Sequence, residues 1–300
     1  MSDVEALSHC MLIWRSFTHW IGGMGVLVFI LCLLPLTGGY HMNLMKAESP
    51  GPSVSKLVPK VQSTAKILYT IYIILTIVEI IFLLIGKMPL FDTLCLSFGT
   101  AGTGGFGIKN DSIASYSTYN QVVITVFMIL FGINFNAYYL LLTKKVMQAA
   151  KNEEVRYYLG IIGLAIVAIA INTREMFTSF GRAFQQAAFQ VGSIITTTGY
   201  ATTDFNVWPV FSKTILVILM FVGACAGSTG GGIKVSRLLI LCKSARKELQ
   251  LYLHPNAVKK IKMDDKAIPH EVVRATNMFL FRVHYDFVTS LLIISLDNLD

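Results

Sequence analysis

A continuous apolar run at residues 66–86 constrains the fold more than any other feature of this sequence. The run contains 21 residues, and Glu79 is its only interior charge. An α-helix rises about 1.5 Å per residue, so a helix of this length crosses the roughly 30 Å hydrocarbon core of a bilayer. The run therefore predicts a transmembrane helix.

Five further runs have the same character, and they lie at residues 11–36, 119–142, 157–171, 207–226 and 278–296. Charged residues make up only 14% of the chain and apolar residues 54%, whereas a soluble domain contains about 25% charged residues. We therefore expect an all-α multi-pass membrane protein with six spans.

The charges orient these spans. When the loops are assigned alternately to the two sides, one side receives Lys144, Lys145 and almost every cation between Lys234 and Arg282. By the positive-inside rule that side is cytoplasmic. Topology and anionic membrane lipid thus account for the formal net charge of +8, and no nucleic-acid partner is expected.

Two similar pentads lie 94 residues apart, Thr-Gly-Gly-Phe-Gly at residues 103–107 and Thr-Thr-Gly-Tyr-Ala at residues 197–201. Each follows a short apolar segment, residues 90–99 and 176–192, that is too short to cross a bilayer. Non-helical backbone is tolerated at membrane depth only where protein covers it or where it lines a watery cavity. The pattern predicts repeated units of helix, re-entrant pore helix and helix.

A Thr-x-Gly-aromatic-small pentad between membrane spans is typical of a potassium selectivity filter. In such a filter, backbone carbonyls replace the hydration shell of the ion, and glycine allows the positive φ that turns the carbonyls toward one axis. Potassium is then the transported ion, and no cofactor is expected. The candidate ion-binding residues are Thr103, Gly104, Gly105 and Phe106 in one filter and Thr197, Thr198, Gly199 and Tyr200 in the other.

These pentads, together with Trp-Arg-Ser-Phe-Thr-His-Trp-Ile-Gly-Gly-Met-Gly at residues 14–25 and Gly-Ser-Thr-Gly-Gly-Gly-Ile-Lys at residues 227–234, resemble the membrane subunit of the Trk/Ktr/HKT superfamily of potassium transporters. The bacterial TrkH/TrkG type is the most similar. The resemblance implies potassium uptake through a channel-like pore or symporter, with four non-identical filters in one chain that each keep a glycine.

The resemblance also implies an intramembrane gate in the inner span of the third pore unit. Its residues are Gly227, Ser228, Thr229, Gly230, Gly231, Gly232 and Lys234. Each glycine disfavours a helix by about 1 kcal/mol relative to alanine, so the span is expected to break there. For Lys234 the alternative is a side chain that extends to the cytoplasmic interface.

By the same resemblance, the chain is the middle of a four-unit protein, truncated at both ends. Residues 1–64 hold the inner span of the first pore unit and a cytoplasmic loop, and residues 65–155 form the second pore unit. Residues 156–250 form the third pore unit, and residues 251–300 a cytoplasmic linker and the start of the fourth. The implied partners are a second copy, as a homodimer, and a cytosolic nucleotide-binding ring protein of the TrkA type. The basic stretch at residues 243–266 is the candidate docking site for that ring, although a solvated or lipid-facing role is equally compatible with it.

Several alternatives remain at this point. A sodium-permeable member of the superfamily is one, although both filters keep glycine, which favours potassium. A non-conducting scaffold or regulatory membrane subunit is another, because two filters cannot surround an ion by themselves. An enzyme is not expected. Residues 102–107 match G-x-G-x-x-G but lack the strand and helix context that this motif needs. Residues 227–234 imitate a phosphate loop, but the lysine comes one residue late and is followed by Val235 and not by Ser or Thr. An intramembrane acid such as Glu79 is by default a candidate functional residue, but Glu79 belongs to an outer span, so we expect it to pair with a neighbouring polar group or to lie near an interface and not to bind the ion.

Overall fold

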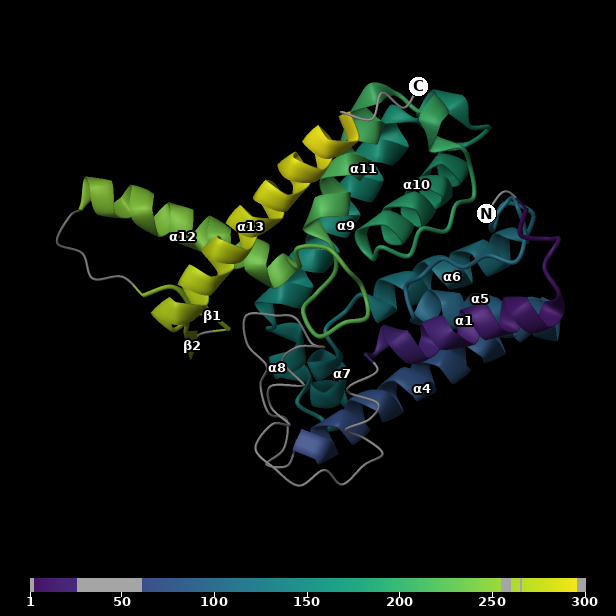
Figure 1. Ribbon diagram of the computed structural model, residues 1–300, viewed down its shortest axis with the longest axis horizontal. Coiled ribbons are helices and arrows are strands. Elements are labelled where there is room, and N and C mark those ends of the chain that lie inside the picture. Colours follow the sequence, from purple (N-terminus) through teal and green to yellow (C-terminus); the bar gives the residue numbers. More distant parts are fainter. Residues whose placement is uncertain (1–2, 26–60, 255–259, 265, 296–300) are drawn as a thin grey trace. The chain divides into compact units, whose positions relative to one another are not determined.

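The computed structural model describes residues 3–25, 61–254, 260–264 and 266–295 (Figure 1). Most of these residues are α-helical, and the other regular elements are two 3-10 turns and one pair of two-residue strands. They form two compact units, Met1–Val235 and Ser236–Asp300. The predicted all-α class is confirmed.

The segment predicted to be the second pore unit contains α4 (Val61–Ile85), α5 (Leu90–Ala101), α6 (Thr118–Phe131) and α7 (Phe135–Leu142). Pro89 stands immediately before α5, where its missing N–H is not needed. Ser117 caps α6 by accepting a hydrogen bond from the Asn120 amide. The short α5 packs against α4 and α6 and also against the N-terminal α1 (His9–Gly23), so protein surrounds it.

The segment predicted to be the third pore unit repeats this order, following the short α8 (Val146–Ala150). It contains α9 (Glu153–Asn172), the 3-10 turn η1 (Arg174–Met176), α10 (Phe180–Ile195), η2 (Phe205–Val207) and α11 (Val210–Val222). The short α10 packs against α9 and α11 of its own unit and against α6 of the other. The two short helices, α5 and α10, therefore occupy equivalent positions in the two pore units.

The other compact unit contains most of α12 (Val235–Leu253), the antiparallel strands β1 (Lys262–Met263) and β2 (Lys266–Ala267), and α13 (His270–Ser295). In α12, Lys243 donates a hydrogen bond from its ammonium to the Lys262 carbonyl at 2.7 Å. The α13 helix has the length and hydropathy of a membrane span, and none of its most apolar window is buried.

Three described helices are long and apolar enough to span a membrane: Thr64–Ile85, Glu153–Asn172 and His270–Ser295. Two of the predicted spans are wrong as single straight helices. The run at residues 119–142 bends by 91° between α6 and α7, and the run at residues 207–226 stops at Val222 because Gly223 adopts a φ of 72°. The predicted span at residues 11–36 is helical to Gly23, and its part beyond residue 25 lies outside the described residues.

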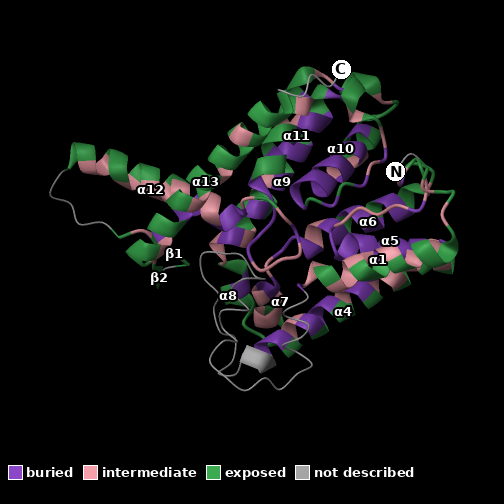
Figure 2. Cartoon of the chain, in the orientation of Figure 1, coloured by how far each residue is buried: buried purple, intermediate pink, exposed green. Residues whose placement is uncertain are grey.

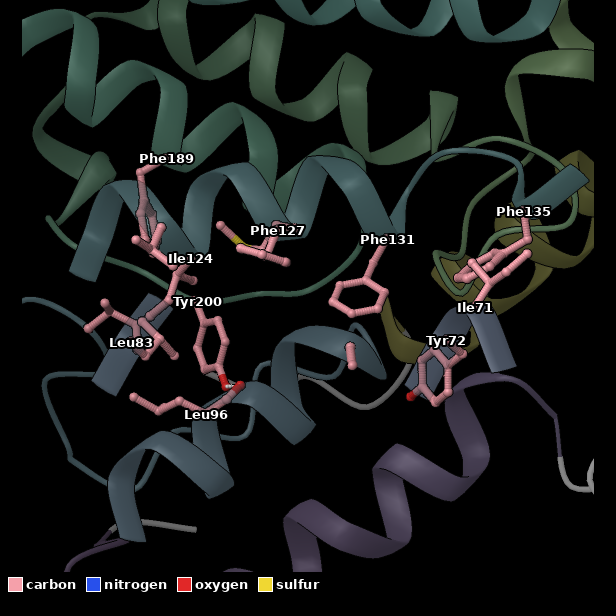
Figure 3. Close-up of a cluster of buried hydrophobic side chains, with 14 of the residues drawn as sticks. Ile71, Tyr72, Leu83, Leu96, Ile124, Phe127, Phe131, Phe135, Phe189 and Tyr200 are labelled. Atoms are coloured by element: carbon pink, nitrogen blue, oxygen red, sulfur yellow. Dashed lines mark hydrogen bonds between the residues drawn. The ribbon is translucent and has the colours of Figure 1, made fainter. Parts of the chain in front are cut away.

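The core around α4, α5 and α6, which also includes side chains from residues 189 and 200, is rich in aromatic side chains. Figure 3 shows Tyr72, Phe131, Phe135, Phe189 and Tyr200 among the buried residues of this cluster. Figure 2 shows that the buried residues lie on the faces where helices meet, while the outward faces are exposed. On α4 the outward face carries isoleucines, including Ile73, Ile77 and Ile81, as expected of a helix whose other face meets lipid.

Glu79 lies in α4 and is completely buried. Neither carboxylate oxygen has a hydrogen-bond partner within the described part of the chain. Thr100 is a polar neighbour of this carboxylate, so the expected pairing stays a prediction.

Candidate functional site

The two predicted filters share one unusual backbone conformation. Thr103 and Gly105 have φ values of 52° and 62°, and the equivalent Thr197 and Gly199 have φ values of 59° and 89°. Positive φ is uncommon for a β-branched residue such as threonine, since its side chain crowds the backbone there. The same strained alternation, placed 94 residues apart, shows that both segments are held in this form by their surroundings.

Equivalent hydrogen bonds attach each filter segment to the short helix that precedes it in the chain. In the Gly105 filter segment (residues 103–107), the amides of Gly104 and Gly105 both donate to the Gly99 carbonyl, at 2.9 and 3.4 Å. In the Gly199 filter segment (residues 197–201), the amides of Thr198 and Gly199 donate to the Ser193 carbonyl at 2.9 and 3.3 Å. Because these amides face the short helices, the carbonyls between them point away from those helices.

Some filter carbonyls are engaged within the protein and others are not. The Gly105 carbonyl accepts from the Gly107 amide at 2.9 Å, and the Tyr200 carbonyl accepts from the Ser193 hydroxyl at 2.6 Å. In the described part of the chain, six others accept no hydrogen bond: the carbonyls of Thr103, Gly104, Phe106, Thr197, Thr198 and Gly199. These six oxygens are chemically suited to a dehydrated monovalent cation.

The two filter segments lie against one another. A Cβ atom built on Gly105 would overlap the Thr198 carbonyl oxygen, so only glycine fits there. The Ile113 amide donates to the Ala201 carbonyl at 3.0 Å, and the Ala201 amide donates to the Ser112 hydroxyl at 3.1 Å. A Cβ on Gly199, by contrast, would meet no described atom within 4 Å, so this glycine faces open space.

The aromatic residue of the Gly199 filter segment reaches across to the other pore unit. Tyr200 is 1% exposed, and its hydroxyl donates to the Leu96 carbonyl of α5 at 3.2 Å. Figure 3 shows its ring beside Leu96, at one end of the aromatic cluster. Tyr200 thus ties one filter to the short helix that carries the other.

Replacing Tyr200 by phenylalanine is expected to remove this tie and keep the ring. One lost neutral hydrogen bond corresponds to about 1 kcal/mol of unfolding free energy, and the looser filter is expected to lower the ratio of rubidium to sodium uptake. The measurements are thermal unfolding in detergent and paired uptake assays. The matched control is Tyr119→Phe on the exposed face of α6; equal behaviour of the two variants would contradict the assigned role.

The N-terminal helix α1 braces the Gly105 filter segment, a role that the sequence did not reveal. The His19 Nε2 atom lies 2.8 Å from the Gly102 carbonyl oxygen. The Arg15 guanidinium donates to the Gly107 carbonyl at 2.7 Å and lies 5.0 Å from the centroid of the Phe106 ring. An arginine and a histidine four positions apart share one face of a helix, and that spacing within an apolar run was the available signal.

The predicted gate residues belong to a non-helical stretch, residues 223–234, that we call the glycine-rich loop. Gly223, Gly227 and Gly232 adopt φ values of 72°, 66° and 83°, which other residues rarely tolerate. Within the loop, the Ser228 hydroxyl donates to the Cys225 carbonyl at 2.6 Å. These glycines allow the chain to turn sharply after α11, so the break that the sequence predicts at residues 227–234 begins already at Gly223.

The glycine-rich loop contacts the first threonine of both filter segments. The Thr103 hydroxyl donates to the Thr229 carbonyl at 2.9 Å, and the Gly231 amide donates to the Thr197 hydroxyl at 2.7 Å. A Cβ on Gly230 would come within 3.0 Å of the Thr196 carbonyl oxygen. The structure therefore brings the predicted gate and both predicted filters together.

The glycine-rich loop is also hydrogen-bonded to the chain at the break between α6 and α7. The Cys225 amide donates to the Gly132 carbonyl at 3.0 Å, and the Phe135 amide donates to the Gly227 carbonyl at 2.9 Å. The Thr229 hydroxyl donates to the Phe131 carbonyl at 3.2 Å. Each interrupted helix thus supplies partners for the backbone groups that the other leaves open, as burial at membrane depth requires.

Lys234 is the last residue of the glycine-rich loop and is bonded within it. Its side chain is 3% exposed, its φ is 81°, and its ammonium donates to the Gly230 carbonyl. The alternative of a lysine that extends to the interface is therefore wrong. The charge lies within the loop itself.

Comparison with known proteins gives a consistent result. The profile of the TrkH family, described as a cation transport protein, matches residues 1–296. The Trk system potassium uptake protein TrkH of Salmonella typhimurium is 33% identical over 302 residues, which cover 99% of this chain and 62% of that protein. TrkG of Escherichia coli is 32% identical over 97% of this chain and 64% of its own length.

The fold matches a solved structure as well. The crystal structure of the potassium transporter TrkH from Vibrio parahaemolyticus superimposes with a TM-score of 0.84 at 32% identity, covering 99% of this chain and 62% of that one. The chain thus spans about three fifths of the length of these relatives.

Proposed function

Because this chain belongs to the TrkH family of cation transport proteins and is a multi-pass protein of the inner membrane, we propose that it contributes two filters and a gate to a potassium-uptake pore. The relatives it matches are named as potassium uptake proteins. Since the chain covers 62% of the Salmonella relative, the remaining walls of the pore are expected from the rest of a four-unit assembly.

The observation that carries the proposal is the pair of matched filter segments. Positive φ values at Thr103 and Gly105, and again at Thr197 and Gly199, leave backbone carbonyls without partners in the described part of the chain. Carbonyl oxygens in this arrangement replace the hydration shell of potassium. In this proposal the ion contacts the carbonyls of residues 103–106 and 197–200, and those already bonded within the protein contribute their second lone pair.

The glycine-rich loop is the proposed gate. Its hydrogen bonds to Thr103 and Thr197 support a loop that lies across the path of an ion leaving the filters. Movement of the loop would have to break these bonds. The buried Lys234 ammonium adds a positive charge at this point, which repels a permeating cation while the loop stays closed.

The partners are proposals of the same kind. A homodimer and a cytosolic ring protein of the TrkA type are expected from the resemblance, with α12 as the docking element because it carries Lys243, Arg246 and Lys247. The pore-unit boundaries at residues 65–155 and 156–250 are likewise proposed. Coupling to protons or sodium would make the protein a symporter, and a sodium-permeable pore is the nearest alternative.

Ion uptake tests the proposal. The protein, expressed from its complete gene in bacteria that lack their own potassium uptake, is expected to restore growth at low potassium and to take up radioactive rubidium. Excess potassium should suppress that uptake more strongly than excess sodium. A membrane-inserted protein that takes up no rubidium would favour the scaffold alternative, and equal suppression by both ions would favour a sodium-permeable pore.

A further inference from the structure

Glu154 is a buried acid that neither the filters nor the proposed gate includes. It lies in the first turn of α9, and its side chain is 2% exposed. A carboxylate is rarely buried to this extent unless its oxygens are bonded. Its partners therefore indicate what it does.

The two carboxylate oxygens contact the two interrupted helices. Oε1 accepts a hydrogen bond from the Ala226 amide at 2.6 Å, at the start of the glycine-rich loop. Oε2 accepts from the Asn134 side-chain amide at 3.2 Å, at the break between α6 and α7. The Glu154 side chain therefore joins α9, the glycine-rich loop and the break between α6 and α7. Hydrogen bonds to an ionised acceptor are about twice as strong as neutral ones.

Asn134 is itself fixed in orientation. Its Oδ1 atom accepts from the Asn136 amide at 2.9 Å and so caps α7. The side-chain NH₂ group must then face Glu154, because reversing the amide would lose the cap. The donor and acceptor roles of the pair are thus defined by the geometry.

We infer that Glu154 is a positioning residue for ion permeation: its carboxylate holds the start of the glycine-rich loop against the α6–α7 break and so keeps the loop across the filters. This inference rests on the proposed function.

Exchanging the hydrogen-bond donor and acceptor between Glu154 and Asn134 tests this role. Glu154→Gln keeps an acceptor for the Ala226 amide but sets an NH₂ group against the NH₂ group of Asn134. Asn134→Asp alone sets two carboxylates together. Combining Glu154→Gln with Asn134→Asp restores one donor and one acceptor, and the new carboxylate can still cap α7.

Each single variant is expected to raise the maximal rate of rubidium uptake by roughly tenfold or more, as loss of one charge-assisted hydrogen bond implies, with little change in the rubidium concentration for half-maximal uptake. The double variant is expected to return to the wild-type rate. The matched control is Glu153→Gln, in the same first turn of α9, which should leave the rate unchanged.

The outcomes distinguish failure of the proposed function from failure of the role assigned to Glu154. Absence of rubidium uptake by the wild-type protein would overturn the proposed function. Wild-type uptake together with unchanged rates in both single variants would overturn the role of Glu154 alone. A double variant that remains as altered as the single variants would also overturn it, because a general packing role is not restored by exchanging the partners.

Discussion

Replacing Gly199 with aspartate is expected to abolish rubidium uptake, with a reduction of at least about 100-fold. The residue has a φ of 89°, and a side chain in this left-handed region costs roughly 1–2 kcal/mol. The aspartate side chain would also enter the open space that Gly199 faces, beside the unbonded carbonyls of Thr197 and Thr198. The ion path and the carbonyl geometry would be lost together.

The same substitution at another glycine provides the control. Gly181 lies in the first turn of α10, where a Cβ would have ordinary contacts and where aspartate is favourable near a helix N-terminus. Gly181→Asp is expected to retain uptake. Normal uptake by Gly199→Asp at equal membrane abundance would rule out this segment as part of the ion path.

Replacing Lys234 with methionine is expected to raise rubidium uptake about tenfold. The substitution keeps a long unbranched side chain but removes the ammonium that binds the Gly230 carbonyl. A hydrogen bond from a charged group contributes about 1.5–3 kcal/mol, so its loss shifts the equilibrium of the loop toward open forms by tenfold or more. Removal of the positive charge also lowers the electrostatic barrier for a cation.

Uptake by Lys234→Met should be compared with Lys234→Arg and Lys151→Met. Arginine keeps the charge and a donor, so its rate should remain closer to that of the wild type. Lys151 is exposed, and its substitution should have no effect. A decrease in uptake by Lys234→Met in a stably inserted protein would show that the lysine supports conduction and does not oppose it.

The helices of this fold follow from the sequence where apolar length alone decides them. The run at residues 66–86 can only be a membrane helix, and α4 follows it closely. The break between α6 and α7 is different, because single Gly132 and Asn134 residues within an apolar run do not force a bend. It depends on the Cys225 amide and the Gly227 carbonyl, whose positions are set by the tertiary fold.

The candidate site, like the fold, could be predicted from the sequence only in part. The filter glycines stand out in the sequence because the pentads repeat, and the loop because consecutive glycines disfavour a helix. The bonds from the loop to Thr103 and Thr197 join residues 126 and 34 positions apart, which no local pattern encodes. Glu154 looks like an ordinary acid at a helix N-terminus, and only the structure shows that it bonds to Ala226 and Asn134.

The most direct test of the central claim is to locate the ion itself. Crystals of the protein, expressed from its complete gene and grown with rubidium in place of potassium, are expected to show anomalous density beside the carbonyl oxygens of the Gly105 and Gly199 filter segments. Addition of excess potassium should displace it, and excess sodium should not. Rubidium density elsewhere in the protein, with none at either filter segment, would contradict the claim that these carbonyls bind the transported ion.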